Sequence, residues 1–105
     1  MKSHGFLRKN NSLIGKFPAV VTDIHDPEQL GRIRVRIPAL GSTLEDWALP
    51  CVPFSLPKRR GAALPAIGSN VWIEFLLGDI SRPIWTGCFY DAGSKVPPAL
   101  RPPAK

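Results

Sequence analysis

Three neighbouring acidic residues are the first group in this chain whose types and spacing could do chemistry. Asp23, Asp26 and Glu28 lie within six residues of one another, and such carboxylates can share a proton for acid–base catalysis or hold a cation. Their spacing does not match a calcium-binding loop, and the Pro and Gly beside them are ordinary turn residues. We therefore interpret this segment as a turn without a metal, and we expect His25 to be an exposed loop residue.

Motifs that would support catalysis are missing from the sequence. It contains no Gly-x-Ser-x-Gly elbow, no phosphate-binding loop and no His/Glu metal helix. The two histidines fall in segments predicted as an arm and a loop, where a nucleophile–base pair would be fortuitous. The sequence predicts no catalytic residue, no cofactor and no metal, and we expect the chain not to be an enzyme.

The two cysteines, Cys51 and Cys88, lie in apolar, strand-like runs. Two cysteines are too few for a disulfide framework, and their spacing is not that of a zinc site. We expect buried free thiols, with a single bridge between them as the alternative. No signal peptide or membrane span is recognisable, so we expect synthesis and folding in a reducing cytoplasm.

A stripe of arginines is the most regular pattern in the chain. The alternating residues are Arg32, Ile33, Arg34, Val35, Arg36 and Ile37. Such alternation predicts a strand over residues 31–38, with guanidinium groups on one face and branched apolar side chains on the other. Three interpretations stay open: a solvated outer face, a subunit interface that pairs the arginines with acidic groups, or a phosphate-binding stripe.

The overall charge is basic, with 14 Lys and Arg against 8 Asp and Glu, giving a net charge of +6. Much of the excess lies near the two ends and in a cluster formed by Lys58, Arg59 and Arg60. A basic balance is compatible with nucleic acid or an acidic partner, but it concerns association and not fold.

The elements that must position these residues are short strands, because no window sustains a helical apolar period and 12 Pro and 9 Gly interrupt the chain. Besides residues 31–38, strands are expected over 16–24, 47–53, 70–75 and 84–90. The last two form a hairpin that turns at Gly78-Asp79, and Gly87 marks a bulge. The predicted fold is all-β: a five-stranded Greek-key barrel of the oligonucleotide/oligosaccharide-binding (OB) type, with an SH3-like barrel as the nearest competitor.

The predicted OB domain covers residues 15–92. Residues 1–14 read as a flexible basic arm, and residues 93–105 as a Pro-rich tail with the composition of a polyproline extension. Residues 54–65 are expected to form a long exposed loop.

Residues 15–92 also resemble a known family, the OB domain shared by phage baseplate hub and spike proteins and by the valine-glycine repeat spike proteins of type VI secretion. The matching segments, in order, are Asp26-Pro27, residues 31–38, Trp47, residues 64–75, Gly78-Asp79, Arg82-Pro83 and Gly87. One departure is Ser69-Asn70, which replaces the more usual acidic residue after the preceding glycine.

The resemblance implies a structural protein that oligomerises on the tail axis, usually as a homotrimer, and connects the hub and tube to the central spike. It implies other hub and spike proteins as partners, no membrane, and a place in the virion's tail baseplate after assembly in the bacterial host cytoplasm. Some relatives add a needle or a lysozyme domain, which we expect another polypeptide to supply here. Candidate interface residues are Arg32, Arg34, Arg36, Trp47, Lys58, Arg59, Arg60, Trp72 and Trp85.

The alternative function is single-stranded nucleic-acid binding, another common use of the OB barrel. Such proteins combine a basic groove with aromatic platforms on which bases stack. The arginine strand is basic, but the residues that alternate with its arginines are Ile, Val and Ile. Trp72 and Trp85 could stack bases, or could pack into the barrel or an interface, and we therefore consider nucleic acid the less well supported partner.

Overall fold

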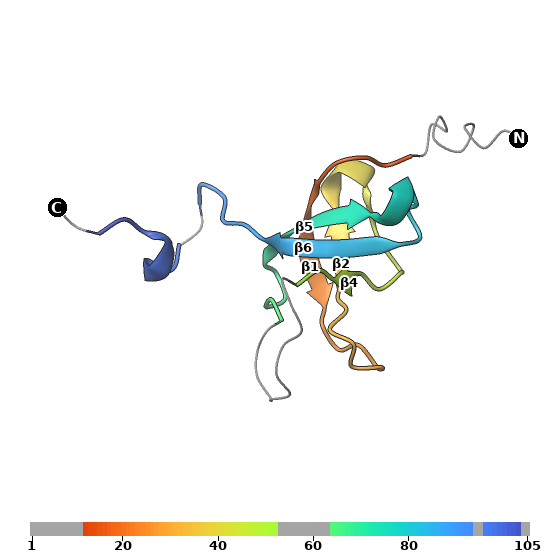
Figure 1. Ribbon diagram of the computed structural model, residues 1–105, viewed down its shortest axis with the longest axis horizontal. Coiled ribbons are helices and arrows are strands. Elements are labelled where there is room, and N and C mark those ends of the chain that lie inside the picture. The colour runs from red at the N-terminus through yellow and green to blue at the C-terminus, as the bar shows by residue number, and fades with distance from the viewer. Residues whose placement is uncertain (1–11, 53–63, 94–95, 104–105) are drawn as a thin grey trace, which may run out of the picture.

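The computed structural model describes residues 12–52, 64–93 and 96–103, and these parts contain strands and short 3-10 turns but no α-helix. The strands are β1 (Phe17–Asp23), β2 (Arg34–Ile37), β3 (Ser42–Thr43), β4 (Leu49–Pro50), β5 (Asn70–Phe75) and β6 (Pro83–Cys88). The 3-10 turns are η1 (Pro38–Leu40), η2 (Leu76–Gly78) and η3 (Pro98–Leu100). The prediction of a domain built from short strands is confirmed (Figure 1).

The strands form one mixed sheet in the order β3-β2-β1-β5-β6-β4. All neighbours are antiparallel except β4 and β6, which run parallel with Leu49 opposite Ile84. Five strands were expected and six are found in the described residues, because the two-residue strand β3 lies in a segment that was expected to be a loop. The sheet is open, and a single bridge between Ile33 and Ala48 joins the start of the β2 segment to the approach of β4. This arrangement is consistent with an OB domain, whereas a closed five-stranded barrel is not confirmed.

The β5–β6 hairpin is confirmed, including its irregularity. The pairing shifts between Val71 opposite Cys88 and Ile73 opposite Trp85, so β6 has one extra residue there. Gly87 lies in this bulge at φ +143°, a backbone conformation that other residues rarely adopt. The connection turns through η2, where Leu77 has φ +55°.

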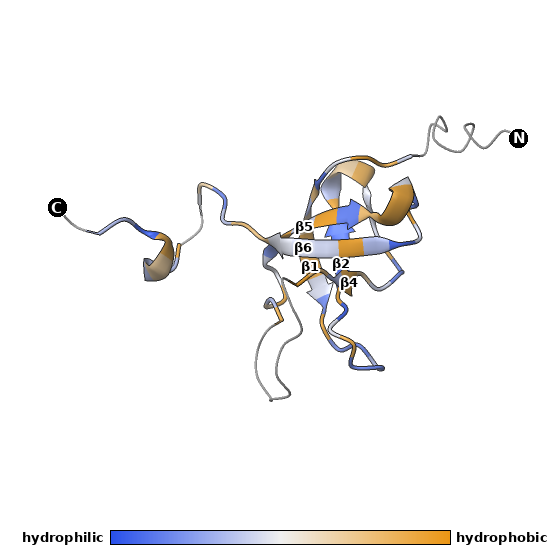
Figure 2. Cartoon of the chain, in the orientation of Figure 1, coloured by the Kyte–Doolittle hydropathy of each residue, from blue (hydrophilic) through white to orange (hydrophobic). Residues whose placement is uncertain are grey.

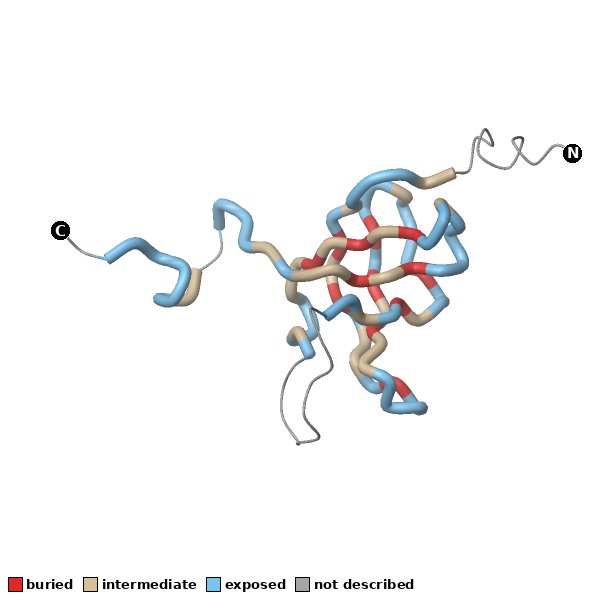
Figure 3. The backbone as a smooth tube through the Cα atoms, viewed as in Figure 1, coloured by how far each residue is buried: buried red, intermediate tan, exposed pale blue. Residues whose placement is uncertain are grey.

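The core follows from the period-2 pattern of the strands. Residues of one parity on β1, β2, β5 and β6 are buried and their neighbours are not (Figure 3). The members are Ala19, Val21, Ile33, Val35, Ile37, Leu44, Ala48, Val71, Ile73, Phe75 and Trp85. The three branched residues that alternate with the arginines are all fully buried, as the alternation predicts.

The expectation of buried cysteines needs correction. Cys51 and Cys88 are free, but both are exposed, because Cys51 follows the last residue of β4 and Cys88 is the last residue of β6. Within the Pro-rich C-terminal segment, residues 98–100 form the turn η3. The predicted loop over residues 54–65 lies almost entirely outside the described residues, as does the basic arm up to residue 11.

Candidate interface surface

The loop between β1 and β2 is organised by a buried ion pair between Asp26 and Arg32. The Arg32 guanidinium donates two hydrogen bonds to the carboxylate, from Nε at 2.9 Å and from Nη2 at 2.7 Å. Only 3% of the Asp26 side chain is exposed. The same carboxylate accepts backbone N–H bonds from Glu28 at 3.0 Å and Leu30 at 2.9 Å. Asp26 therefore orders the whole turn, and turn chemistry explains it without a metal.

Electrostatics within this loop favour the charged forms of both partners. The hydrogen bonds from Arg32, followed by those of the backbone N–H groups, hold the pKa of Asp26 far below its usual range, against the opposing effect of burial. The bond to Asp26 likewise raises the pKa of Arg32. Glu28 adds a longer contact, 3.7 Å from Arg32 Nη2. The first of the three predicted interface arginines is therefore neutralised within its own chain.

The three arginines differ in their surroundings, although the sequence places them on one stripe. Arg34 is half-buried, and its guanidinium carbon lies 4.5 Å from the centre of the Trp47 ring, a cation–π distance. The Arg34 Nε is buried without a hydrogen-bond partner in the described structure. Arg36 is exposed, and no ion pair to another described residue is found for it. Arg34 and Trp47 thus form one cluster, and the Arg32 guanidinium lies over the same ring at 5.9 Å, whereas no cation–π contact is found for Arg36 among the described residues.

A groove lies next to this cluster, between the approach to β4 and the beginning of β6, and we call it the Trp47 groove. Its volume is about 490 Å³. Its apolar lining comes from Trp47, Leu49, Leu76, Pro83 and Ile84. Its charged lining comes from Arg32, Glu45, Asp46 and Arg82. The groove therefore combines an aromatic wall with charges of both signs, which suits a peptide more than a compact metabolite.

The two other tryptophans that were predicted as interface residues, Trp72 and Trp85, mainly make contacts within the fold. Trp85 is buried, and its indole Nε1–H donates to the Gly31 carbonyl at 3.1 Å, tying β6 to the Asp26 loop. Trp72 is half-buried on the outer face of β5 and stacks on Phe89 at 4.2 Å between ring centres. The remaining candidates, Lys58, Arg59 and Arg60, lie outside the described residues.

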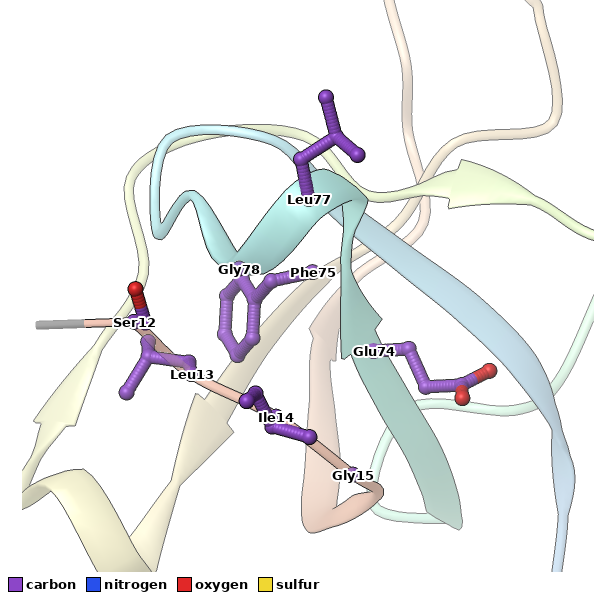
Figure 4. A pocket seen from close by; sticks show the side chains of 8 residues that line it. All are labelled: Ser12, Leu13, Ile14, Gly15, Glu74, Phe75, Leu77 and Gly78. Carbon is purple, nitrogen blue, oxygen red and sulfur yellow. The ribbon is translucent and has the colours of Figure 1, made fainter. Parts of the chain in front are cut away.

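A second hollow, of about 280 Å³, lies where residues 12–15 cross the β5–η2 connection. The Leu13 N–H donates to the Gly78 carbonyl at 3.1 Å, and the Phe75 ring lies behind this segment (Figure 4). Ile14 and Leu77 are 83% and 70% exposed, and Leu77 points away from the segment in the close-up. Figure 2 shows η2 as a hydrophobic element on the surface. Sequence reasoning left this apolar surface out, although Leu76-Leu77 in a turn was the signal for it.

In the parts that the structure describes, no group of three or more His, Cys, Asp and Glu side chains could hold a metal ion. Cys88 is exposed as a residue, but partial burial of its thiol raises the pKa of that group. No helix in the described ranges is both long and apolar enough to cross a membrane.

Comparison with known proteins identifies a family and a relative of this chain. Residues 17–90 match the model of the type VI secretion system/phage-baseplate injector OB domain. The chain is also 29% identical over 75 residues to the type VI secretion system spike protein VgrG5 of Pseudomonas aeruginosa. This alignment covers 67% of the chain and only 10% of the relative, so the chain spans about a tenth of that protein's length.

Proposed function

Because the chain belongs to the type VI secretion system/phage-baseplate injector OB domain family, we propose that it is a structural component of a contractile phage tail baseplate or a related contractile injection system. In this role it oligomerises on the tail axis and connects the hub and tube to the central spike. Its place is the tail baseplate of the virion, after assembly in the bacterial host cytoplasm. Its partners are other hub and spike proteins.

The observation that carries this proposal is the extent of the family match. Residues 17–90 include every strand of the described residues, from the first residue of β1 to the end of β6. The shared region thus contains the complete described sheet and not one motif within it. The family is one of structural spike and baseplate domains, and the five-stranded Greek-key barrel of the OB type is part of the proposal for this chain.

Exposed apolar side chains around the β5–β6 connection support oligomerisation. Leu76, Leu77 and Ile80 are all exposed there, and Ile14, on the segment that crosses this connection, is exposed as well. Soluble monomers rarely leave large contiguous apolar surface in water. We propose a homotrimer in which this surface, together with the Arg34–Trp47 cluster, contacts neighbouring subunits.

The remaining interface residues predicted from the sequence have different roles in the proposed assembly. Arg36 offers a free charge on β2, and the basic cluster of Lys58, Arg59 and Arg60 offers a contact to an acidic partner. Arg32, Trp72 and Trp85 act indirectly, since their side chains already bond or stack within the chain.

Single-stranded nucleic-acid binding has weaker support. A binding groove of that kind needs free cations beside exposed aromatic faces. Of the arginine stripe, Arg32 is paired with Asp26 and Arg34 is stacked on Trp47. The Trp85 ring is buried. The surface of the sheet therefore favours a protein partner.

The experiment that tests the proposal is the native mass of the purified chain, measured by light scattering at low and moderate salt. A salt-insensitive species of three times the 11.5 kDa chain mass, or a higher multiple of three, supports the axial hub role. A monomer that also binds labelled single-stranded DNA tightly, and loses it steeply with salt, supports the nucleic-acid alternative instead.

A further inference from the structure

The Trp47 groove has two acidic side chains that pair with no cation among the residues that the structure describes. Of its charged residues, Arg32 is paired with Asp26 at 2.7 Å, and Arg82 lies 3.8 Å from Asp79. Glu45 and Asp46 are exposed, and no ion pair to a described residue involves either one. The groove therefore places an apolar surface beside Trp47 next to two carboxylates that no described cation pairs with. The ligand that fits it best combines an apolar side chain with an adjacent cation.

The C-terminal segment of the chain carries such a pair. Leu100 and Arg101 lie between Pro97-Pro98 and Pro102-Pro103, and Leu100 is 65% exposed. The turn η3 holds them through N–H bonds from Leu100 to Pro97 O at 2.9 Å and from Arg101 to Pro98 O at 3.0 Å. Prolines on both sides restrict the unbound backbone, so less conformational entropy is lost on binding.

We infer that the Trp47 groove of one copy binds the Leu100–Arg101 turn of a second copy. Leu100 enters the apolar part beside Trp47 and Leu49, and Arg101 meets Glu45 and Asp46. The Arg101 Nε already donates to the Val96 carbonyl at 3.1 Å, which leaves the terminal guanidinium nitrogens for the carboxylates. The contact is charge-complementary, and Pro-rich segments commonly dock in aromatic-lined grooves.

The position of the groove favours a second copy over the chain's own tail. Pro83, where β6 begins, lines the groove, and the tail follows the other end of this strand. Six residues of extended strand span about 20 Å, and residues 89–93 continue away from Pro83 (Figure 1). A tail-to-groove contact joins two different surfaces, and such heterologous contacts give rings of identical subunits where the rotation closes and open filaments where it does not. The inference does not depend on the proposed baseplate role.

The test is binding of a fluorescent peptide with the sequence of residues 93–105 to the full chain, followed by fluorescence anisotropy at low salt. We expect saturable binding that weakens at least about tenfold with Leu100→Ala in the peptide, because a buried leucine is lost. Arg101→Glu in the peptide, or Asp46→Lys in the chain, should each weaken binding about fivefold or more, and the two changes combined should restore it. Lys105→Glu is the matched control, with the same charge change outside the turn, and should have an effect below about twofold.

A mixing experiment separates a second copy from the chain's own tail. The Asp46→Lys chain is labelled with ¹⁵N, and the indole signal of Trp47 is followed while unlabelled Arg101→Glu chain is added. The control is the addition of unlabelled Asp46→Lys chain. If the Trp47 signal shifts with the Arg101→Glu chain but not with this control, the copies are in contact. If the Arg101→Glu chain produces no shift, the inference is wrong. Equal binding of all peptide variants, or no binding, also overturns it. The native mass of the Arg101→Glu chain separates this contact from the proposed function, because a multiple of three that persists there would show an axial oligomer that forms without the tail-to-groove contact.

Discussion

The carboxylate of Asp26 and the guanidinium of Arg32 form a two-bond ion pair that closes the loop between β1 and β2. The pair is held among three backbone N–H groups that also point at the carboxylate. Trp85 adds a bond from β6 to Gly31, next to Arg32. Arg32, the first of the proposed interface residues, is therefore fixed within this loop by its bonds to Asp26.

Replacing Asp26 by Asn should destabilise the domain, because the change removes the charge that balances a largely buried Arg32. We expect a larger fall in the thermal midpoint than for Asp79→Asn, measured by circular dichroism under the same conditions. Asp79 makes a comparable turn with Ser81 and lies near Arg82, but it is 45% exposed. Equal midpoints for the two variants would mean that the Asp26–Arg32 pair does not hold the loop.

The depressed pKa of Asp26 also predicts how stability changes with pH. An unfolded aspartate has a pKa of about 3.9, and the folded value lies below it, so the folded state binds fewer protons from this group. Its contribution is fully present above about pH 4 and is lost as the pH falls through the folded pKa. The free energy of unfolding, measured with urea between pH 2 and 7, should therefore fall at acidic pH. Asp26→Asn should reduce the slope of this free energy against pH. An unchanged slope would contradict the assignment.

A charge in the core should unfold the domain. Val35 is fully buried, and a buried branched side chain contributes about 1.5–3 kcal/mol before the cost of the charge is added. Val35→Asp should therefore abolish the cooperative thermal melt, as should Ile73→Asp on β5. Arg36→Asp is the matched control, since it places the same residue on the exposed face of β2. A normal melt for Val35→Asp would show that this face is not the core.

Most of the core was predictable from the sequence, because burial on one face imposes a period of two. Alternation identified Ile33, Val35 and Ile37, and Gly87 marked the bulge in β6. The pairing of Asp26 with Arg32 was not predicted. Alternation placed Arg32 with the other arginines, but β2 begins only at Arg34, so Arg32 belongs to the loop. Its partner six residues earlier was explained as an ordinary turn residue.

Long-range pairing limited the remaining predictions. The parallel ladder of β4 on β6 involves only Leu49 and Pro50 on one side, and a two-residue strand has no periodicity to recognise. The exposure of Cys51 and Cys88 depends on where these two strands end. The Trp47 groove is formed by Arg32, residues 45–49 and residues 76–84, which are separated in the sequence, and no local pattern in any of them indicates a hollow.

Gly78 should be needed for the segment of residues 12–15 to dock on the hairpin. A Cβ at Gly78 would lie 3.3 Å from Leu13 N and 3.4 Å from Ser12 Cα. Gly78→Ala should therefore increase the rate of hydrogen exchange at the Leu13 amide. The same change also introduces backbone strain of about 1 kcal/mol or more, because alanine is unfavourable at positive φ. Gly41→Ala is the matched control, because Gly41 has a similar φ and no neighbour within 4 Å. If both variants leave exchange at Leu13 unchanged, the segment is not held by this contact.

Arg34 provides the sharpest test of the proposed subunit interface. Its Nε is buried without a partner in the described structure, and its guanidinium stacks on Trp47. A carboxylate or carbonyl of a neighbouring subunit would satisfy this donor, whose burial is otherwise unfavourable. Arg34→Glu should abolish the trimer in light scattering while costing the fold only about 1 kcal/mol of cation–π energy. Arg34→Lys, which keeps the charge but not the planar group, should give a trimer that dissociates more readily on dilution. If the Arg34→Glu chain forms the trimer as stably as the unchanged chain, the interface lies elsewhere. The exposed apolar residues of η2 are then the next residues to substitute.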